Sequence, residues 1–202
     1  MAKAVEKGLV EYSLINIRDF AVDKHKTCDD ATYGGGAGMV LKPEPLAAAL
    51  DTIKGSLKRV IYPSPSGIKF DQNQAKRLAE YEELVFICGR YEGIDQRIID
   101  LYVDEEISIG DYVISSGEIS TLVIIDSVYR LLEGVISSES LVEESFSDGL
   151  LEYPHYTRPA DFRGLSVPDV LVSGNHAKIN KWRYEKRVEK TRKNRPDIYI
   201  DI

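Results

Sequence analysis

Strand-like and helix-like segments alternate along the first two thirds of the chain, and this alternation limits the possible folds more than any single motif does. Short apolar, β-branched runs predict strands at 59–62, 84–88 and 106–109. The stretches that follow or precede them predict helices at 43–54, 71–81, 94–103 and 118–132. A repeat of strand, loop and helix is typical of a parallel sheet covered by helices. The sequence therefore predicts an α/β fold.

The first forty residues do not follow this pattern. The chain opens with a short helical segment at 2–7, whereas a doubly wound domain normally begins on a strand. Residues 9–17 alternate between apolar and polar side chains and predict a strand. A long loop follows at 18–43, and it holds four glycines among residues 34–38. We interpret this glycine loop as a flexible segment that closes over a substrate, the alternative being a loop of tight turns.

Three loops fall at the carboxyl ends of the predicted strands, where parallel sheets bind their ligands. They are residues 62–67, 88–93 and 109–117. All three contain glycine or serine, which allow a close approach to the backbone. Neither a Gly-x-Gly-x-x-Gly sequence after a strand nor a Walker-type lysine motif is present.

The net charge of −7 is unevenly distributed. Residues 1–97 are balanced, residues 98–153 carry a net −12, and residues 154–202 carry a net +5. Eight basic and two acidic side chains lie between positions 181 and 195. A basic helix beside an acidic body suits a polyanion that is held in one place. A solvated surface helix is the alternative.

Composition also predicts the domain organisation. We expect a ligand-binding domain at 1–136, a flexible acidic and serine-rich linker at 137–152, and a C-terminal domain at 153–202. The last domain is expected to hold a basic helix at 174–195, capped by Asn175 or Ser173 and ended by Pro196. A linker carboxylate brought beside a ligand pocket could act as a general base.

Several classes of protein are excluded. Two cysteines are too few for a disulfide scaffold or a cysteine-based metal cluster, and the three histidines lack metal-ligand spacing. No uncharged run is long enough to span a bilayer, and no signal peptide is readable at the N-terminus. We therefore expect a cytoplasmic protein with no metal and no membrane partner.

A set of motifs in a fixed order resembles one family over residues 2–197. The motifs are YGGGAGM at 33–39, CGRYEGID at 88–95, SIGDYV at 108–113, SF at 145–146 with GLLE at 149–152, YTRP at 156–159, SGNH at 173–176, WR at 182–183 and RPD at 195–197. The chain resembles the bacterial tRNA (guanine-N1)-methyltransferases of the SPOUT class. This family normally has a further strand and helix before the segment at 2–8.

The resemblance implies a parallel-sheet domain with a deep C-terminal trefoil knot, followed by a small, mainly helical domain. It further implies S-adenosylmethionine as cofactor, tRNA as partner, methylation at N1 of guanosine 37 next to the anticodon, and a homodimer with the active site at the subunit interface. The implied cofactor-binding residues are Tyr62, Ser64, Pro65, Gly89, Arg90, Glu92, Gly93, Ile109, Gly110, Asp111, Tyr112, Val113, Ile114, Ser116 and Gly117. The implied RNA-binding residues are Gly34, Gly35, Gly36, Asn175, His176, Lys181, Arg183, Arg187 and Arg192.

The resemblance also assigns catalytic roles. Glu144 stands where the family has an aspartate as general base, Asp148 is the alternative base, and Arg130 would stabilise negative charge on guanine O6. Ser116 stands where the family usually has the first of two glycines. These departures leave a second hypothesis, a catalytically impaired relative that binds tRNA or S-adenosylmethionine.

Overall fold

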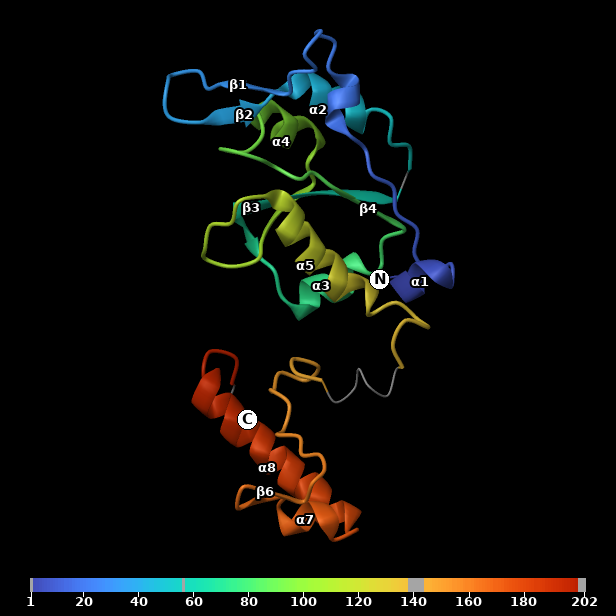
Figure 1. Cartoon of the computed structure of the whole chain (residues 1–202), viewed down its shortest axis with the longest axis vertical. Coiled ribbons are helices and arrows are strands. Elements are labelled where there is room, and N and C mark those ends of the chain that lie inside the picture. Colours follow the sequence, from blue (N-terminus) through green and yellow to red (C-terminus); the bar gives the residue numbers. More distant parts are fainter. Residues whose placement is uncertain (1, 56, 138–143, 200–202) are drawn as a thin grey trace. The chain divides into compact units, whose positions relative to one another are not determined.

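The computed structural model describes residues 2–55, 57–137 and 144–199. The chain divides into two compact units, Met1–Ile136 and Ser137–Ile202, which are described separately (Figure 1). None of the helices among the described residues combines the length and the apolar character that crossing a membrane requires.

The first unit is built on a three-stranded parallel sheet with the order β4-β3-β5. Strand β3 is Lys58–Lys69, β4 is Glu83–Phe86 and β5 is Glu105–Ser108. Both neighbours of the central strand β3 run parallel to it. The predicted α/β class with a parallel sheet is thereby confirmed.

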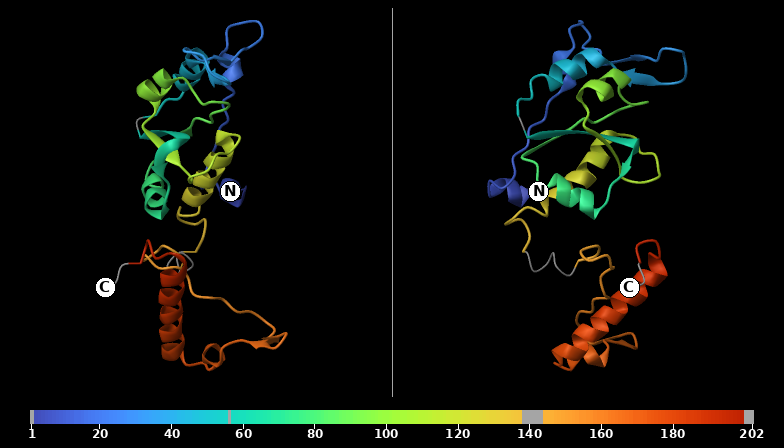
Figure 2. Two further views of the ribbon diagram at one scale, coloured as in Figure 1. Left: turned by 90° about the vertical axis from the view of Figure 1, so that its left-hand side faces the viewer. Right: turned by 180° about the vertical axis from the view of Figure 1, so that it is seen from behind.

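Helices cover both faces of this sheet (Figures 1 and 2). Helices α2, Pro43–Leu50, and α4, Gln96–Tyr102, pack with Val60 and Tyr62 of β3 in one apolar cluster. Helices α3, Gln72–Leu78, and α5, Gly117–Tyr129, pack with Ile61 in a second cluster. Successive side chains of a strand point to opposite faces, so adjacent residues of β3 join different cores.

Helices α2, α3 and α4 of the first unit begin at the capping residues and the proline that the sequence places at their N-termini. The Asp71 carboxylate caps α3 by accepting a hydrogen bond from the Gln74 amide at 2.9 Å. Asp95 caps α4 in the same way through the Arg97 amide at 2.9 Å. Pro43 is the first residue of α2, where its missing N–H leaves no donor unpaired.

The predicted strand at 9–17 is wrong. After α1, Ala2–Glu6, the chain runs without regular structure as far as the short 3-10 helix η1, Ile17–Phe20. No strand lies beside residues 9–16 in the described part of the chain, so their backbone has no neighbouring strand with which to form a sheet. Leu14 is 90% exposed and Tyr12 is 59% exposed.

Two predicted loops contain more structure than expected. The loop at 18–43 includes an antiparallel hairpin of β1, Asp29–Ala31, and β2, Met39–Leu41. The turn predicted at 62–67 does not end its strand, because β3 continues to Lys69. Pro63 and Ile68 both pair with Ile107, so residues 64–67 leave the ladder and return to it.

The second unit contains the long helix α8, His176–Asn194, the short helix α7, Asp169–Val172, and a hairpin of β6, Asp161–Phe162, and β7, Leu165–Ser166. The predicted cap Asn175 is confirmed, because its side chain accepts a hydrogen bond from the Lys178 amide at 3.1 Å. Ser173 does not cap this helix.

Within the segment predicted as a flexible linker, 137–152, two residues contact α8. The Leu151 amide donates to Thr191 Oγ1 at 2.9 Å, and Lys190 Nζ donates to the Glu152 carbonyl at 3.1 Å. These contacts hold the segment along α8. Residues 138–143 of the predicted linker lie outside the described residues.

Candidate functional site

Two of the predicted cofactor loops meet at the carboxyl end of the parallel sheet. Residues 88–93 follow β4, and residues 109–116 connect β5 with α5. The Gly117 amide, at the start of α5, donates a hydrogen bond to the Gly89 carbonyl at 3.0 Å. The sheet therefore brings together residues that are separated by more than twenty positions in the sequence.

Gly117 is required at this contact because no side chain fits between the two backbones. A Cβ at Gly117 would lie 2.6 Å from the Gly89 nitrogen and 3.0 Å from the Cys88 Cα atom. The preceding residue, Ser116, has a φ of −161°, an extended conformation that any residue adopts. Serine in place of glycine at position 116 therefore introduces no backbone strain.

The Tyr62 side chain packs against the loop at 88–93. Its ring is only 7% exposed, and Cβ atoms at Gly89 and Gly93 would lie 3.0 Å and 2.9 Å from its hydroxyl oxygen. Burial raises the pKa of Tyr62, while a hydrogen bond from the Ile94 amide acts in the opposite direction. Tyr62 was predicted to belong to the first cofactor loop, 62–67, and the structure places its buried side chain against the second, 88–93.

The excursion in β3 forms the third part of the site. Pro65 is exposed and Ser64 is half-buried, with the Ser64 hydroxyl accepting a hydrogen bond from the Ser66 amide at 3.1 Å. A Cβ at Gly67 would overlap with the backbone of Glu106 and Ile107. The excursion is therefore packed directly against β5, the strand that leads into the loop at 109–116.

The loop after β5 is held from inside and presents apolar side chains outward. The buried Ser108 hydroxyl donates to the Gly110 carbonyl at 3.1 Å, and the Tyr112 hydroxyl donates to the Ile109 carbonyl at 3.3 Å. Tyr112 is 57% exposed and Val113 is 88% exposed. Ile114 is half-buried and Asp111 is exposed. Such a loop offers both backbone polar groups and an apolar surface to a ligand.

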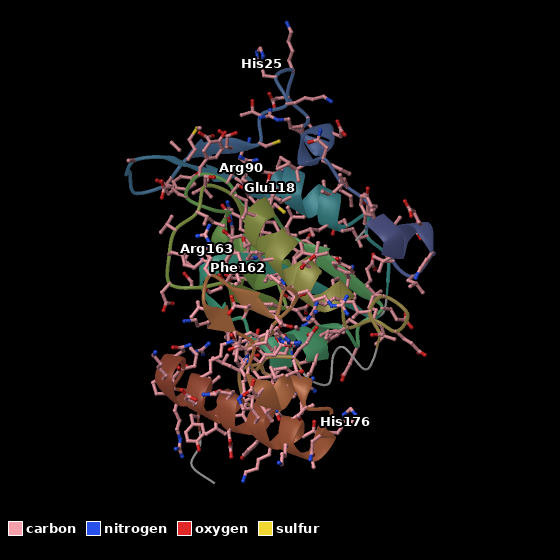
Figure 3. The ribbon with its side chains drawn as sticks, turned by 60° about the horizontal axis from the view of Figure 1, so that its bottom comes forward. His25, Arg90, Glu118, Phe162, Arg163 and His176 are labelled. Carbon is pink, nitrogen blue, oxygen red and sulfur yellow. The ribbon has the colours of Figure 1, made fainter. Side chains whose placement is uncertain are left out.

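Sequence reasoning missed Glu118, in the first turn of α5, which forms an ion pair at 2.8 Å with Arg90 of the loop at 88–93 (Figure 3). Burial works against ionisation of the Glu118 carboxyl, yet hydrogen bonds from its own amide and from Arg90 hold its pKa below the usual value. Its Oε2 atom is buried and has no hydrogen-bond partner among the described residues. The sequence feature that could have identified Glu118 is an acidic residue in the first turn of a helix that follows a loop at the end of a strand.

The glycine loop adjoins the same region through β2. The Leu41 amide donates to the Gly93 carbonyl and the Glu92 amide donates to the Met39 carbonyl, both at 3.0 Å. The Glu92 side chain lies against Gly38. At the tip of the hairpin are the residues predicted to contact RNA, all with positive φ: Gly34, Gly35 and Gly36.

The three predicted catalytic residues are divided between the units. Arg130 is the C-cap residue of α5 in the first unit, whereas Glu144 and Asp148 lie in the second. The Glu144 carbonyl accepts hydrogen bonds from the Ser147 amide at 3.2 Å and the Ser147 hydroxyl at 2.8 Å. Asp148 forms an ion pair with Arg187, which holds the pKa of that carboxyl below its usual value.

Comparison with known proteins identifies the family. The family model for tRNA (Guanine-1)-methyltransferase TrmD matches residues 1–201. The chain belongs to the TrmD family. Among its relatives, a tRNA (guanine-N(1)-)-methyltransferase of Treponema denticola is 67% identical over 198 residues, which cover 98% of this chain and 82% of that protein. The enzymes of the same name from Borreliella burgdorferi and Treponema pallidum are 64% and 58% identical, over 84% and 79% of their lengths.

In this member of the TrmD family, several basic residues predicted to bind RNA make contacts within the second unit. The Arg187 side chain is only 15% exposed, and its Nε atom donates to the Leu151 carbonyl at 3.3 Å. Arg183 lies over the Tyr153 ring at 4.6 Å, and Arg192 donates to the Tyr199 hydroxyl at 2.7 Å.

The remaining residues of the predicted RNA surface lie nearer the start of α8. Lys181 is 79% exposed and lies 3.9 Å from Glu185. His176 is exposed in the first turn of α8, directly after the cap residue Asn175. These positions, rather than Arg187, leave polar groups at the surface of the unit.

Proposed function

We propose that this TrmD-family chain transfers a methyl group from S-adenosylmethionine to N1 of guanosine 37 in tRNA, next to the anticodon, in the cytoplasm. The observation that carries the proposal is the direct backbone contact between Gly117 and Gly89. It joins two strand-end loops at the edge where parallel sheets bind ligands. The family match over residues 1–201 supports the same conclusion.

The residues around this contact suit an adenosine-containing cofactor. Glycine at positions 89 and 117 lets the two loop backbones approach each other directly, and backbone N–H and C=O groups of such loops would form hydrogen bonds to adenine. The exposed side chains of Tyr112 and Val113 provide apolar surface for its rings. When bound, S-adenosylmethionine supplies a methyl group activated by a positively charged sulfonium.

The target atom of guanine requires a base. Neutral guanine carries a proton on N1, so this proton must leave when N1 gains a methyl group. We assign Glu144 to accept it. Asp148 is the weaker candidate, because its ion pair with Arg187 lowers its pKa and so reduces its affinity for a proton. The guanidinium of Arg130 would stabilise the negative charge that develops on O6 as the proton leaves.

The residues that we assign to catalysis are divided between the units, since Arg130 belongs to the first and Glu144 to the second. From the resemblance to the SPOUT class we propose a homodimer with the active site at the subunit interface. We also propose that the loops 88–93 and 109–117 belong to a trefoil knot. Sedimentation tests the homodimer, and a crystal structure tests the knot.

Methyl transfer from tritiated S-adenosylmethionine tests the proposed function. The substrates are two tRNA transcripts that differ only at position 37, one with guanosine after guanosine 36 and one with adenosine. We expect incorporation into the guanosine 37 transcript alone. Equal incorporation into both transcripts would show a different target nucleotide. No incorporation into either, with the cofactor still bound, would contradict the enzymatic assignment.

The assignment of the base is tested by two matched variants. Glu144→Gln removes the carboxylate but keeps the size of the side chain, so turnover should fall by about 10²- to 10⁴-fold. Affinity for S-adenosylmethionine, measured by calorimetry, should stay unchanged. Asp148→Asn is the matched comparison and should reduce turnover less. The reverse order of effects would move the role of base to Asp148.

A further inference from the structure

The hairpin of β6 and β7 is a small, self-supporting projection of the second unit. Asp161 pairs with Ser166 and Phe162 pairs with Leu165, so Arg163 and Gly164 form a two-residue turn. Both turn residues have positive φ, 56° for Arg163 and 81° for Gly164. Two positive φ values in succession define the turn type that matches the twist of a hairpin.

Arginine is an unfavourable choice at the first position of this turn. Asparagine, aspartate and glycine tolerate positive φ there, whereas a long side chain without a local hydrogen bond to its own backbone gains nothing from it. An unfavourable residue at such a position is a reason to look for a function outside the hairpin. The turn itself is held by Asp161, which accepts hydrogen bonds from the Gly164 amide at 3.3 Å and the Ser166 hydroxyl at 3.0 Å.

The hairpin contributes nothing to a core, and its side chains are presented outward. Phe162 is 59% exposed and Leu165 is 76% exposed. The Arg163 guanidinium lies over the Phe162 ring at 5.2 Å (Figure 3). Within the described part of the chain, no acidic side chain lies at ion-pair distance from Arg163. In this respect Arg163 differs from Arg187 and Arg195 of the same unit, which pair with Asp148 and Asp197.

An exposed ring with a stacked cation fits a single-stranded nucleotide. Aromatic side chains stack on unpaired bases, and guanidinium groups pair with phosphates or stack on bases themselves. The surrounding segment, residues 154–202, carries a net charge of +5, which favours an anionic partner such as RNA over a neutral or basic surface.

We propose that the β6–β7 hairpin is an RNA contact, in which the Phe162 ring stacks on a base that is unpaired in the folded tRNA and the Arg163 guanidinium pairs with a neighbouring phosphate. The inference rests on the proposed function, because that function supplies tRNA as the ligand. It adds a binding element that is separate from α8 and from the glycine loop.

Binding of a fluorescent tRNA transcript to the full chain, followed by anisotropy at several salt concentrations, tests the hairpin. Arg163→Asn removes the charge and creates an Asn-Gly turn, which should keep the hairpin intact. Phe162→Leu keeps an apolar side chain but removes the ring. Lys24→Asn is the control, since it removes one exposed cation from the first unit, far from the hairpin in sequence.

We expect Phe162→Leu to weaken binding by about fivefold or more, the range observed for the loss of one base stack. Arg163→Asn should weaken binding and reduce the slope of log affinity against log salt by about 0.7, the value for one phosphate of a single strand. Lys24→Asn should leave both quantities nearly unchanged. Binding to a fully paired RNA duplex should not depend on Phe162, because no unpaired base is available there.

The inference and the proposed function fail in different ways. If the wild-type chain methylates guanosine 37 while both hairpin variants bind tRNA with wild-type affinity, the inference is overturned and the function stands. If the variants lose affinity but the wild-type chain transfers no methyl group, the function fails and the RNA contact stands. A change in sedimentation mass with unchanged tRNA affinity would assign the hairpin to a protein contact and overturn the inference. Circular dichroism and a thermal melt show that each variant is folded.

Discussion

The two units of this chain are stabilised by different interactions. In the described residues, every buried apolar side chain except that of Tyr153 lies in the first unit, and most of them form two clusters on the opposite faces of the sheet. The second unit relies on polar contacts along α8. Thr191, with 0% exposure, accepts a hydrogen bond from the Leu151 amide, and Arg187 holds Asp148.

The two units should therefore be destabilised by different kinds of substitution. An apolar core tolerates small polar changes at the surface but not added volume, because its interior is already close-packed. A unit held by individual hydrogen bonds loses much of its order when one buried partner is removed.

The largest effect is expected for added volume at the loop contact. Gly117→Ala places a methyl group against the backbone of Cys88 and Gly89, which should lower the free energy of unfolding by about 3 kcal/mol. Gly55→Ala is the control, because its new methyl group meets only the far end of the Glu83 side chain. Urea unfolding measures both variants. Equal stability for the two would show that the close approach at Gly117 is not needed.

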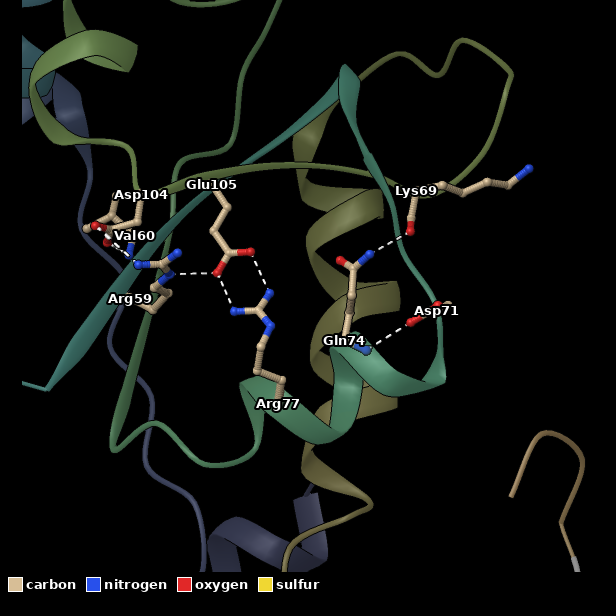
Figure 4. A network of polar contacts seen from close by, with 8 residues as sticks. All are labelled: Arg59, Val60, Lys69, Asp71, Gln74, Arg77, Asp104 and Glu105. Atoms are coloured by element: carbon tan, nitrogen blue, oxygen red, sulfur yellow. Dashed lines mark hydrogen bonds and ion pairs between the residues drawn. The ribbon is translucent and has the colours of Figure 1, made fainter. Parts of the chain in front are cut away.

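The first unit also contains a polar network around Glu105 (Figure 4). We expect this network to stabilise the first unit although the rest of that unit is held by apolar packing. Glu105, with a side chain only 12% exposed, accepts hydrogen bonds from Arg59 Nε at 2.6 Å and Arg77 Nη1 at 2.8 Å. Glu105→Gln should destabilise the unit by about 2 kcal/mol at pH 7, less than for a fully buried pair because both arginines are partly exposed.

The same network predicts a pH dependence. Arg77 holds the pKa of Glu105 below its usual 4.5, and Arg59 adds to this effect against the opposing influence of burial. A carboxyl group whose pKa is lowered by folding stabilises the folded chain at pH values above its pKa in the unfolded chain. This stabilisation is lost as the pH falls through the pKa of the folded chain. The difference in unfolding free energy between wild type and Glu105→Gln should therefore be full at pH 7 and shrink below about pH 4. A constant difference down to pH 2 would argue against the ion pairs.

A smaller effect is expected in the second unit for Thr191→Val. This change removes the acceptor of the partly buried Leu151 amide, which should cost about 1–2 kcal/mol and loosen residues 144–152. Hydrogen exchange of the Leu151 amide is the readout. Thr157→Val, at an exposed threonine, is the matched control and should leave that exchange unchanged. Protection of Leu151 that survives Thr191→Val would mean that other contacts hold the segment.

The smallest effect is the response of the same segment to acid. Arg187 lowers the pKa of Asp148, so the ion pair is fully present above 3.8 and is lost as the pH falls below that value. Exchange protection of residues 148–152 should therefore decrease below about pH 4, while protection in the middle of α8 should not. Asp148→Asn should remove this pH dependence. Identical profiles for wild type and Asp148→Asn would exclude the pair as the cause.

Local signals in the sequence predicted much of the first unit. Asp71 caps its helix as expected, and the apolar runs that include Ile61 and Val85 form parallel strands. The failure at residues 9–17 has a physical cause, because alternation describes a strand only when a neighbouring strand supplies hydrogen bonds. The continuation of β3 past Pro63 was missed since the excursion at 64–67 looks locally like a turn.

The second unit was harder to predict, because its order depends on contacts between segments. The acidic, serine-rich composition around Asp148 indicated a flexible linker, but Arg187 and Thr191, about forty residues later, hold that segment. The resemblance, together with the basic charge of residues 181–195, likewise assigned Arg187 to RNA. Neither shows which basic side chains already form ion pairs within the unit. Glu118 of α5 was missed because its partner Arg90 lies in the loop at 88–93, distant in the sequence.

We propose that the contact between Gly117 and Gly89 creates the cofactor site of the first unit. Calorimetric titration of S-adenosylmethionine into the wild type, Gly117→Ala and Thr191→Val tests it most directly, at a temperature where all three are folded. We expect equal affinity for wild type and Thr191→Val, and loss of binding for Gly117→Ala. Absence of binding to the wild type, or unchanged binding to Gly117→Ala, would contradict it.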